Sequence, residues 1–182
     1  MKRVKGLMLL VPLLLTACED KNEVYSSPPQ DIVAKVEAYL PLVEQYIHDN
    51  QKIALELGEP LSDKQLQMAS RIGLTYPDKV RIHYVERLPR PENESLLFQF
   101  QRLGMDSPHF AGITYGHGIW IKNQYRGDKL LLAHELIHVR QVEEQGLTEQ
   151  TRSYLLQLMI FGYKEAPDEV EAYTLAPQYL EK

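Results

Sequence analysis

The stretch Leu130-Leu-Leu-Ala-His134-Glu135-Leu-Ile-His138-Val-Arg-Gln141 decides how this chain is interpreted. It follows Gly127-Asp128, runs toward Gly146 and is apolar on nearly every side, which predicts a buried helix of about five turns. His134 and His138 are four residues apart, so their side chains lie one above the other on one helix face. Two imidazoles placed in this way predict a site for one metal ion.

Glu135 completes the pattern H-E-x-x-H. A zinc hydrolase needs imidazole ligands, an open coordination position for water, and a carboxylate base that is not itself a ligand. In this interpretation His134 and His138 bind Zn²⁺ and Glu135 is the base. The alternative is that ordinary hydrogen bonds satisfy both histidines and that Glu135 pairs with an arginine such as Arg140. Partners are needed in either case, because an unpaired buried polar group costs about 1–3 kcal/mol.

The N-terminus has the features of a secretory signal peptide at residues 1–17. Three basic residues precede an apolar run from Leu7 to Leu15, which is too short to span a membrane as a helix. The run ends in Leu15-Thr-Ala-Cys18, which resembles a bacterial lipobox. That resemblance implies that Cys18 becomes the lipidated N-terminus and anchors the protein in the bacterial cell envelope. Glu19 and Asp20 follow, and they favour the periplasmic face of the outer membrane.

Composition narrows the function further. Cys18 is the only cysteine, so it forms no internal disulfide and the chain has no Cys-type zinc site. Removal of residues 1–17 takes away three of the 20 basic residues and leaves 17 against 25 acidic ones, a formal net charge of −8. This charge argues against nucleic acid as a partner.

The remaining length suits one domain. Residues 18–30 are polar and contain prolines, so we predict a tether to the membrane. Residues 31–182 form the predicted domain, with a helical cap at 31–76 and a catalytic module at 77–182. In the cap, apolar residues recur at helical spacing from residue 33 to 47, and Pro41 is expected to kink or split that helix. Ser62-Asp-Lys-Gln65 predicts the capping box of a second helix.

The catalytic module changes to a period of two at residues 80–85, which predicts a strand. Residues 112–121 are strand-like but contain glycines, and two interpretations are open. Gly116-His117 is a hairpin turn, or Gly116 and Gly118 allow another backbone to approach one continuous strand, in which case His117 faces the cleft. A strongly apolar helix capped by Thr148 is predicted to pack in the core. The fold class is therefore α+β, mostly helical, with a small sheet or hairpin beside the H-E-x-x-H helix.

A catalytic zinc site requires a third protein ligand. No histidine follows His138, so the downstream candidates are acidic. Here the chain resembles the gluzincin branch of zinc metallopeptidases, whose small and membrane-bound members take a ligand glutamate from an E-x-x-A motif on a later helix. Glu169-Val-Glu171-Ala172 has that form, although Tyr173 stands where membrane-bound relatives commonly have aspartate. The resemblance covers roughly residues 80–173 and implies a zincin-like domain in which Glu169 is the third ligand.

The residues around Glu169 agree with this assignment. Pro167 predicts the start of a helix there, and a carboxylate in the first turn is held in its ionised form by the helix dipole. Glu171 is about 200° further round the helix, so it and Glu169 cannot both face one metal. Glu171 as the ligand, and Glu169 as an ordinary helix-start carboxylate, are the alternatives.

The predicted function is zinc-dependent hydrolysis of a peptide or protein substrate, by a metallopeptidase held at the membrane through its lipid anchor. A donor for the oxyanion is also needed, and the candidates are Tyr115, His117, Tyr163 and Tyr173. The competing hypothesis is a non-catalytic envelope lipoprotein that binds a periplasmic partner or a cell-wall component, with a structural metal or none.

Overall fold

Helices and short strands alternate along residues 21–180, which are the residues that the structure, a computed structural model, describes. The elements are α1 (Lys21–Ser26), α2 (Gln30–Leu57), β1 (Glu59–Pro60), α3 (Asp63–Ile72), β2 (Arg81–Val85), α4 (Glu94–Arg102), β3 (Gly112–Tyr115), β4 (Gly118–Lys122), α5 (Lys129–Gln145), α6 (Leu147–Ile160) and α7 (Pro167–Leu175), with 3-10 turns at Pro77–Lys79, Asn123–Tyr125, Tyr163–Glu165 and Ala176–Tyr179. The predicted α+β class, mostly helical with a small sheet, is confirmed.

The four strands form one mixed sheet in the order β1-β2-β4-β3. β1 is antiparallel to β2, β2 is parallel to β4, and β3 and β4 form an antiparallel hairpin in which Thr114 is opposite Ile119. The hairpin turn is at Gly116, whose φ of 59° lies in the left-handed region. Of the two interpretations of residues 112–121, the hairpin is therefore confirmed and the continuous strand is wrong.

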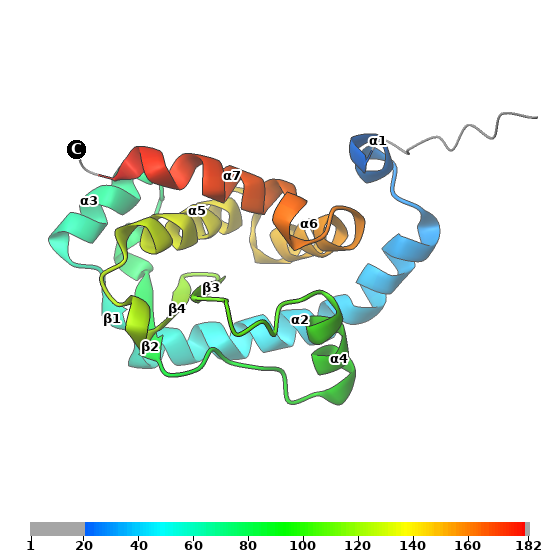
Figure 1. Ribbon diagram of the computed structural model, residues 1–182, viewed down its shortest axis with the longest axis horizontal. Coiled ribbons are helices and arrows are strands. Elements are labelled where there is room, and N and C mark those ends of the chain that lie inside the picture. The colour runs from blue at the N-terminus through cyan, green and yellow to red at the C-terminus, as the bar shows by residue number, and fades with distance from the viewer. Residues whose placement is uncertain (1–20, 181–182) are drawn as a thin grey trace, which may run out of the picture.

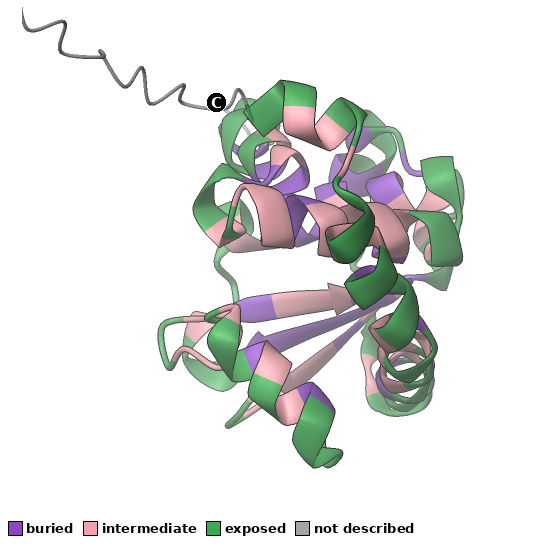
Figure 2. Ribbon diagram, turned by 90° about the vertical axis from the view of Figure 1, so that its right-hand side faces the viewer, coloured by how far each residue is buried: buried purple, intermediate pink, exposed green. Residues whose placement is uncertain are grey.

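The sheet is covered on both faces, because the side chains of β4 alternate between them. Ile119 and Ile121 belong to the main core with residues of α3 and α5, whereas Trp120 packs with Ala54 of α2 on the other face. Figure 1 shows the resulting layers, with α2 below the sheet and α5, α3 and α7 above it. Buried residues, purple in Figure 2, lie on the strands and on the helix layer that faces them.

α5 lies at the centre of this arrangement because of its sequence. Asp128 caps it by accepting hydrogen bonds from the amides of Leu130 (2.9 Å) and Leu131 (3.0 Å). Leu136, Ile137 and Val139 are fully buried in the main core, and α5 packs against both β3 and α7. Only a buried helix of this kind carries His134 and Glu135 into the interior of the domain, where both are buried.

Several local predictions need correction. Residues 21–26, assigned to the tether, form α1, which packs on α6: the Tyr25 hydroxyl is 2.7 Å from Ser153 Oγ. Pro41 lies inside α2 and does not split it. The Ser62 capping box of α3 is confirmed. The cap residue of α6 is Gly146, not Thr148, because the helix begins at Leu147. Cys18 and the signal peptide lie outside the described residues. No helix among residues 21–180 combines the length and the apolar character needed to cross a bilayer.

Candidate metal centre

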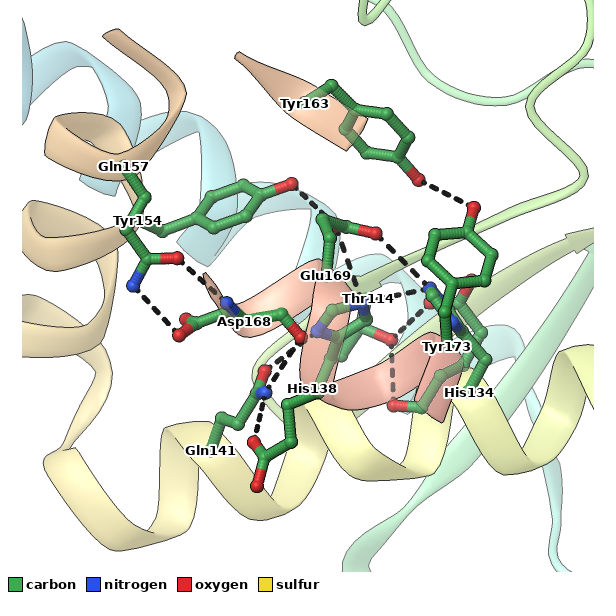
Figure 3. A network of polar contacts seen from close by, with 12 residues as sticks. Thr114, His134, His138, Gln141, Tyr154, Gln157, Tyr163, Asp168, Glu169 and Tyr173 are labelled. Carbon is green, nitrogen blue, oxygen red and sulfur yellow. Dashed lines mark hydrogen bonds and ion pairs between the residues drawn. The ribbon is translucent and has the colours of Figure 1, made fainter. Parts of the chain in front are cut away.

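The two histidines of α5 face each other as the four-residue spacing predicts. Their Nε2 atoms are 3.1 Å apart, and the ring centroids are 4.7 Å apart. Glu169 approaches them from the first turn of α7, where Pro167 occupies the first helical positions. Its Oε2 is 3.4 Å from His134 Nε2, and its Oε1 is 3.5 Å from His138 Nε2. The three predicted ligands are thus brought together although α5 and α7 are far apart in sequence (Figure 3).

The spacing of these donor atoms matches a zinc site. Ligands about 2.0–2.1 Å from Zn²⁺ in tetrahedral geometry stand about 3.3 Å from one another. The three distances here, 3.1, 3.4 and 3.5 Å, fall around that value, although the two Glu169 distances are made by different carboxylate oxygens. One donor atom from each of the three residues lies within 4.8 Å of the other two. In addition, Oε2 of Glu169 is buried and has no hydrogen-bond partner among the described residues. A carboxylate oxygen left in this state costs about 1–3 kcal/mol unless a cation binds it, so the residues present fit a divalent metal ion.

Gln141 fixes the orientation and the tautomer of the His138 ring. Its amide nitrogen donates to the carbonyl oxygen of Asp168 (3.1 Å) and to Glu171 Oε2 (2.7 Å), which turns its amide oxygen toward His138. That oxygen is 2.8 Å from His138 Nδ1. Because an amide oxygen only accepts, the neutral ring carries its proton on Nδ1 and presents the lone pair of Nε2 to the centre.

Glu169 is held by a second set of partners. The Tyr154 hydroxyl donates to Glu169 Oε1 at 2.7 Å. The neighbouring Asp168 is fixed to α6, since its amide donates to Gln157 Oε1 (2.9 Å) and its carboxylate accepts from Gln157 Nε2 (2.8 Å). These bonds fix the start of α7, and therefore the position of Glu169, against α6 (Figure 3).

Charge and burial act in opposite directions on these ligands. Burial lowers the pKa of His134, but the close contact with Glu169 and the charges of Glu135 and Glu169 raise it more, so the net shift is upward. Burial raises the pKa of Glu169, but the close contact with His134, the charge of His138 and the hydrogen bond from Tyr154 lower it more. Glu169 is thus ionised at neutral pH, which is the state that a metal ligand needs.

Glu135 lies beside the triad and outside it. Its carboxylate is buried and accepts a 2.6 Å hydrogen bond from Thr114 Oγ1 on β3. Burial raises its pKa, against the opposing charges of His134 and His138. Gly112 provides the space for it, because a Cβ atom there would lie 2.8 Å from Glu135 Oε1. The proposed pairing of Glu135 with Arg140 is wrong: Arg140 pairs with Glu171 at 2.6 Å.

A cavity of about 150 Å³ opens onto the four residues His134, Glu135, His138 and Glu169. It extends between α2, α4 and α6, so α6 lines a cavity and does not simply pack in the core as predicted. Tyr154 and Leu158 are among its α6 residues, and Ile113 comes from β3.

The four candidate oxyanion donors differ in whether they line the cavity and in what their side chains contact. Tyr163 lines the cavity, and its hydroxyl is 3.4 Å from that of Tyr173, whose ring lies 4.4 Å from the His134 ring. Tyr115 also lines the cavity, but its hydroxyl donates to Tyr46 (3.2 Å). His117 does not line it, so the prediction that it faces the cleft is wrong. Its Nε2 lies 2.8 Å from Glu143 Oε1, at the far end of the hairpin.

Sequence reasoning missed Thr114, Gln141, Tyr154, Gln157 and Asp168. Only Gln141 had a local signal, since it stands three residues after His138 on the same helix face. The others reach the centre through contacts between separate elements.

No protein-family model, no curated protein and no solved structure matches this chain. The site therefore rests on its own residues and geometry.

Proposed function

We propose that this protein is a zinc-dependent peptide hydrolase of the gluzincin type. The single observation that carries the proposal is the convergence of His134, His138 and Glu169 within 3.1–3.5 Å, beside a buried carboxylate that is not one of them. Zn²⁺ in such a site supplies a Lewis acid that polarises a carbonyl and acidifies water. The E-x-x-A form of residues 169–172 and the H-E-x-x-H form of residues 134–138 support the family assignment.

Glu135 serves as the general base. It takes the proton of the attacking water and passes it to the leaving amine. The raised pKa suits this role, because a base whose pKa lies nearer to neutral pH is also a competent acid in the second step. The hydrogen bond from Thr114 leaves Oε1 free for the proton and fixes the direction of the carboxylate.

Tyr163 is the best placed oxyanion donor. It lines the cavity, and burial raises its pKa further above its usual value of 10, so its hydroxyl keeps the proton that it must donate. The Tyr115 and Tyr154 hydroxyls already donate to Tyr46 and Glu169.

Strand β3 supplies a surface for an extended peptide. It is an edge strand, paired with β4 alone within residues 21–180. The amide of Lys122 donates to the carbonyl of Ala111. In this antiparallel ladder, the residues whose backbone N–H and C=O groups point toward β4 are therefore 111, 113 and 115. Gly112 and Thr114 therefore direct their backbone N–H and C=O groups outward. A substrate strand added there would use them and pass beside Glu135.

The test compares two variants of the mature chain purified without chelator. Glu135→Gln should retain zinc and lose hydrolysis, by at least about 100-fold. His138→Ala should lose both. Zinc is measured by atomic spectroscopy and hydrolysis by digestion of a mixed peptide library with and without chelator. Absence of zinc from the wild-type protein, or full activity of Glu135→Gln, would contradict the proposal. A chelator-dependent fall in melting temperature without hydrolysis would favour a non-catalytic lipoprotein with a structural metal.

We also propose that the protein is anchored in the bacterial envelope through Cys18. The lipobox-like residues 15–18 support this location. Labelling with a radioactive fatty acid, which Cys18→Ser should abolish, tests it.

A further inference from the structure

The cavity beside the triad has apolar walls over most of its extent. α4 contributes Leu96 and Phe100, and α6 contributes Leu155 and Met159. Among residues 21–180, Lys35 is the only charged residue that lines it apart from those of the candidate metal centre, and Lys35 pairs with Asp31 at 3.2 Å. The lining also contains uncharged polar side chains such as Gln99 and Gln150, but most of the exposed wall is apolar, which favours an apolar ligand group.

The lining of α2 shows the direction of the cavity. Val36, Tyr39, Val43, Tyr46 and Ile47 recur at threes and fours on one face of the helix. From Val36 to Ile47 this face extends about 17 Å at 1.5 Å per residue. An extended peptide covers that distance with about five residues. The cavity therefore follows this face of α2, and its lining includes Glu135 and the two histidines.

The ligand is better matched by a peptide than by a hydrocarbon chain. Gly112 and Thr114 of β3 line the same cavity, and their outward backbone groups need hydrogen-bond partners that a peptide provides and an acyl chain does not. The cavity volume of about 150 Å³ is large enough for a group about the size of benzene. It fits one bulky apolar side chain and leaves the remaining substrate residues along the groove.

We infer that the substrates are polypeptide segments that place a bulky apolar side chain, aromatic or branched aliphatic, in the cavity between α2, α4 and α6 within a few residues of the scissile bond. This inference rests on the proposed function and names its substrate class. Segments of this composition are buried in folded proteins, so unfolded or flexible chains are the substrates that carry them.

The test measures binding separately from hydrolysis. Zinc-loaded Glu135→Gln protein is titrated into fluorescent eight-residue peptides that differ only at one central residue, which is Ala, Gln, Leu or Phe, and anisotropy is recorded. Burial of a large apolar side chain should make the Phe and Leu peptides bind about 10- to 100-fold more tightly than the Ala peptide. Equal affinity for all four would overturn the inference, whether or not the wild-type protein hydrolyses peptides.

Two adjacent residues of α2 give a matched pair of variants in the Glu135→Gln background. Val43 lines the cavity, whereas Leu42 is 41% exposed and does not. Val43→Asp should abolish the preference for Phe, and Leu42→Asp should leave it unchanged. Val43→Thr keeps the shape of the side chain, so it tests the same point if the aspartate variant does not fold. Loss of the preference in Leu42→Asp, or its retention in both Val43 variants, would overturn the inference. So would binding of laurate below its micellar concentration without binding of the Phe peptide.

Discussion

The amide oxygen of Gln141 lies 2.8 Å from Nδ1 of His138, on the side of the ring that faces away from the other two ligands. Ligand histidines in metal sites are usually oriented by a carboxylate or a backbone carbonyl. Here a glutamine takes that role, and it is itself held by Glu171 and by the carbonyl of Asp168. On the other side of the site, the centroid of the Tyr173 ring lies 4.4 Å from that of His134.

Gln141→Leu should therefore weaken zinc binding by about 10- to 100-fold, because His138 loses the acceptor that fixes its tautomer. Competition with a chromophoric zinc chelator measures the affinity. Gln145→Leu, in the exposed last residue of the same helix, is the control and should bind zinc as the wild type does. An unchanged affinity in Gln141→Leu would show that Gln141 does not orient the ligand.

Thr114→Val should move the acidic limb of the kcat/KM profile to higher pH. The Thr114 hydroxyl lowers the pKa of Glu135, so its removal raises that pKa further, and the base is then deprotonated only at higher pH. Zinc content should not change, since Thr114 contacts no ligand. The measurement is initial rates between pH 5 and 8 in roughly half-unit steps. Thr148→Val, at an exposed threonine of α6, should leave the profile in place.

Glu135→Gln should stabilise the metal-stripped protein at alkaline pH. The folded-state pKa of Glu135 is raised above its usual 4.5, so the stability associated with its protonated form is present below that value and is lost as pH rises through the raised pKa. Glutamine removes this loss, and we expect a gain of about 0.5–2 kcal/mol in the free energy of unfolding at pH 8. Urea denaturation at pH 8 and near pH 4.5 measures it. The gain should shrink at the lower pH, and a variant less stable than the wild type at pH 8 would contradict it.

The sequence was most informative where one element contains the whole signal. The H-E-x-x-H spacing on an apolar helix predicted the facing imidazoles. For residues 112–121 the glycines left a hairpin and a continuous strand both open, and only the structure decided between them. Glu169 was reached only through the E-x-x-A motif, since no local pattern states which later helix returns to α5. The hydrogen bond from Tyr154 and the anchoring of Asp168 by Gln157 depend on how α6 and α7 pack, so no local pattern in either helix predicts them.

The same reason explains the errors. His117 lies next to a glycine in a strand-like stretch, which made a role in the cleft plausible, but its partner Glu143 is 26 residues away on α5 and holds it elsewhere. The sheet order was also beyond prediction, because the parallel pairing of β2 with β4 joins strands separated by α4 and β3. The apolar residues of α6 predicted burial, and they lie against the wall of a cavity.

Gly112→Ala should reduce activity with little loss of stability. The added Cβ would lie 2.8 Å from Glu135 Oε1 and 3.2 Å from both its Cδ and the backbone oxygen of Trp120, so the Glu135 carboxylate has to shift from the position that Thr114 holds. Displacement of the base by about 1 Å can cost about 100-fold in rate. The measurement is kcat together with the melting temperature and zinc content, both of which should stay close to wild type. An active Gly112→Ala would show that the position of Glu135 is not critical.

Tyr163→Phe should lower kcat by about 100- to 1,000-fold with a small change in KM, because the hydroxyl acts on charge that develops only in the transition state. Its neighbour provides the matched comparison. The Tyr173 hydroxyl is 3.4 Å from that of Tyr163, but Tyr173 is 58% exposed and does not line the cavity. Tyr173→Phe should therefore reduce kcat much less, and both variants should keep their zinc because neither hydroxyl contacts a ligand. If Tyr173→Phe instead shows the larger loss, the donor is Tyr173 and Tyr163 only orients it. Equal wild-type rates in both would mean that the oxyanion is stabilised by the metal without a tyrosine.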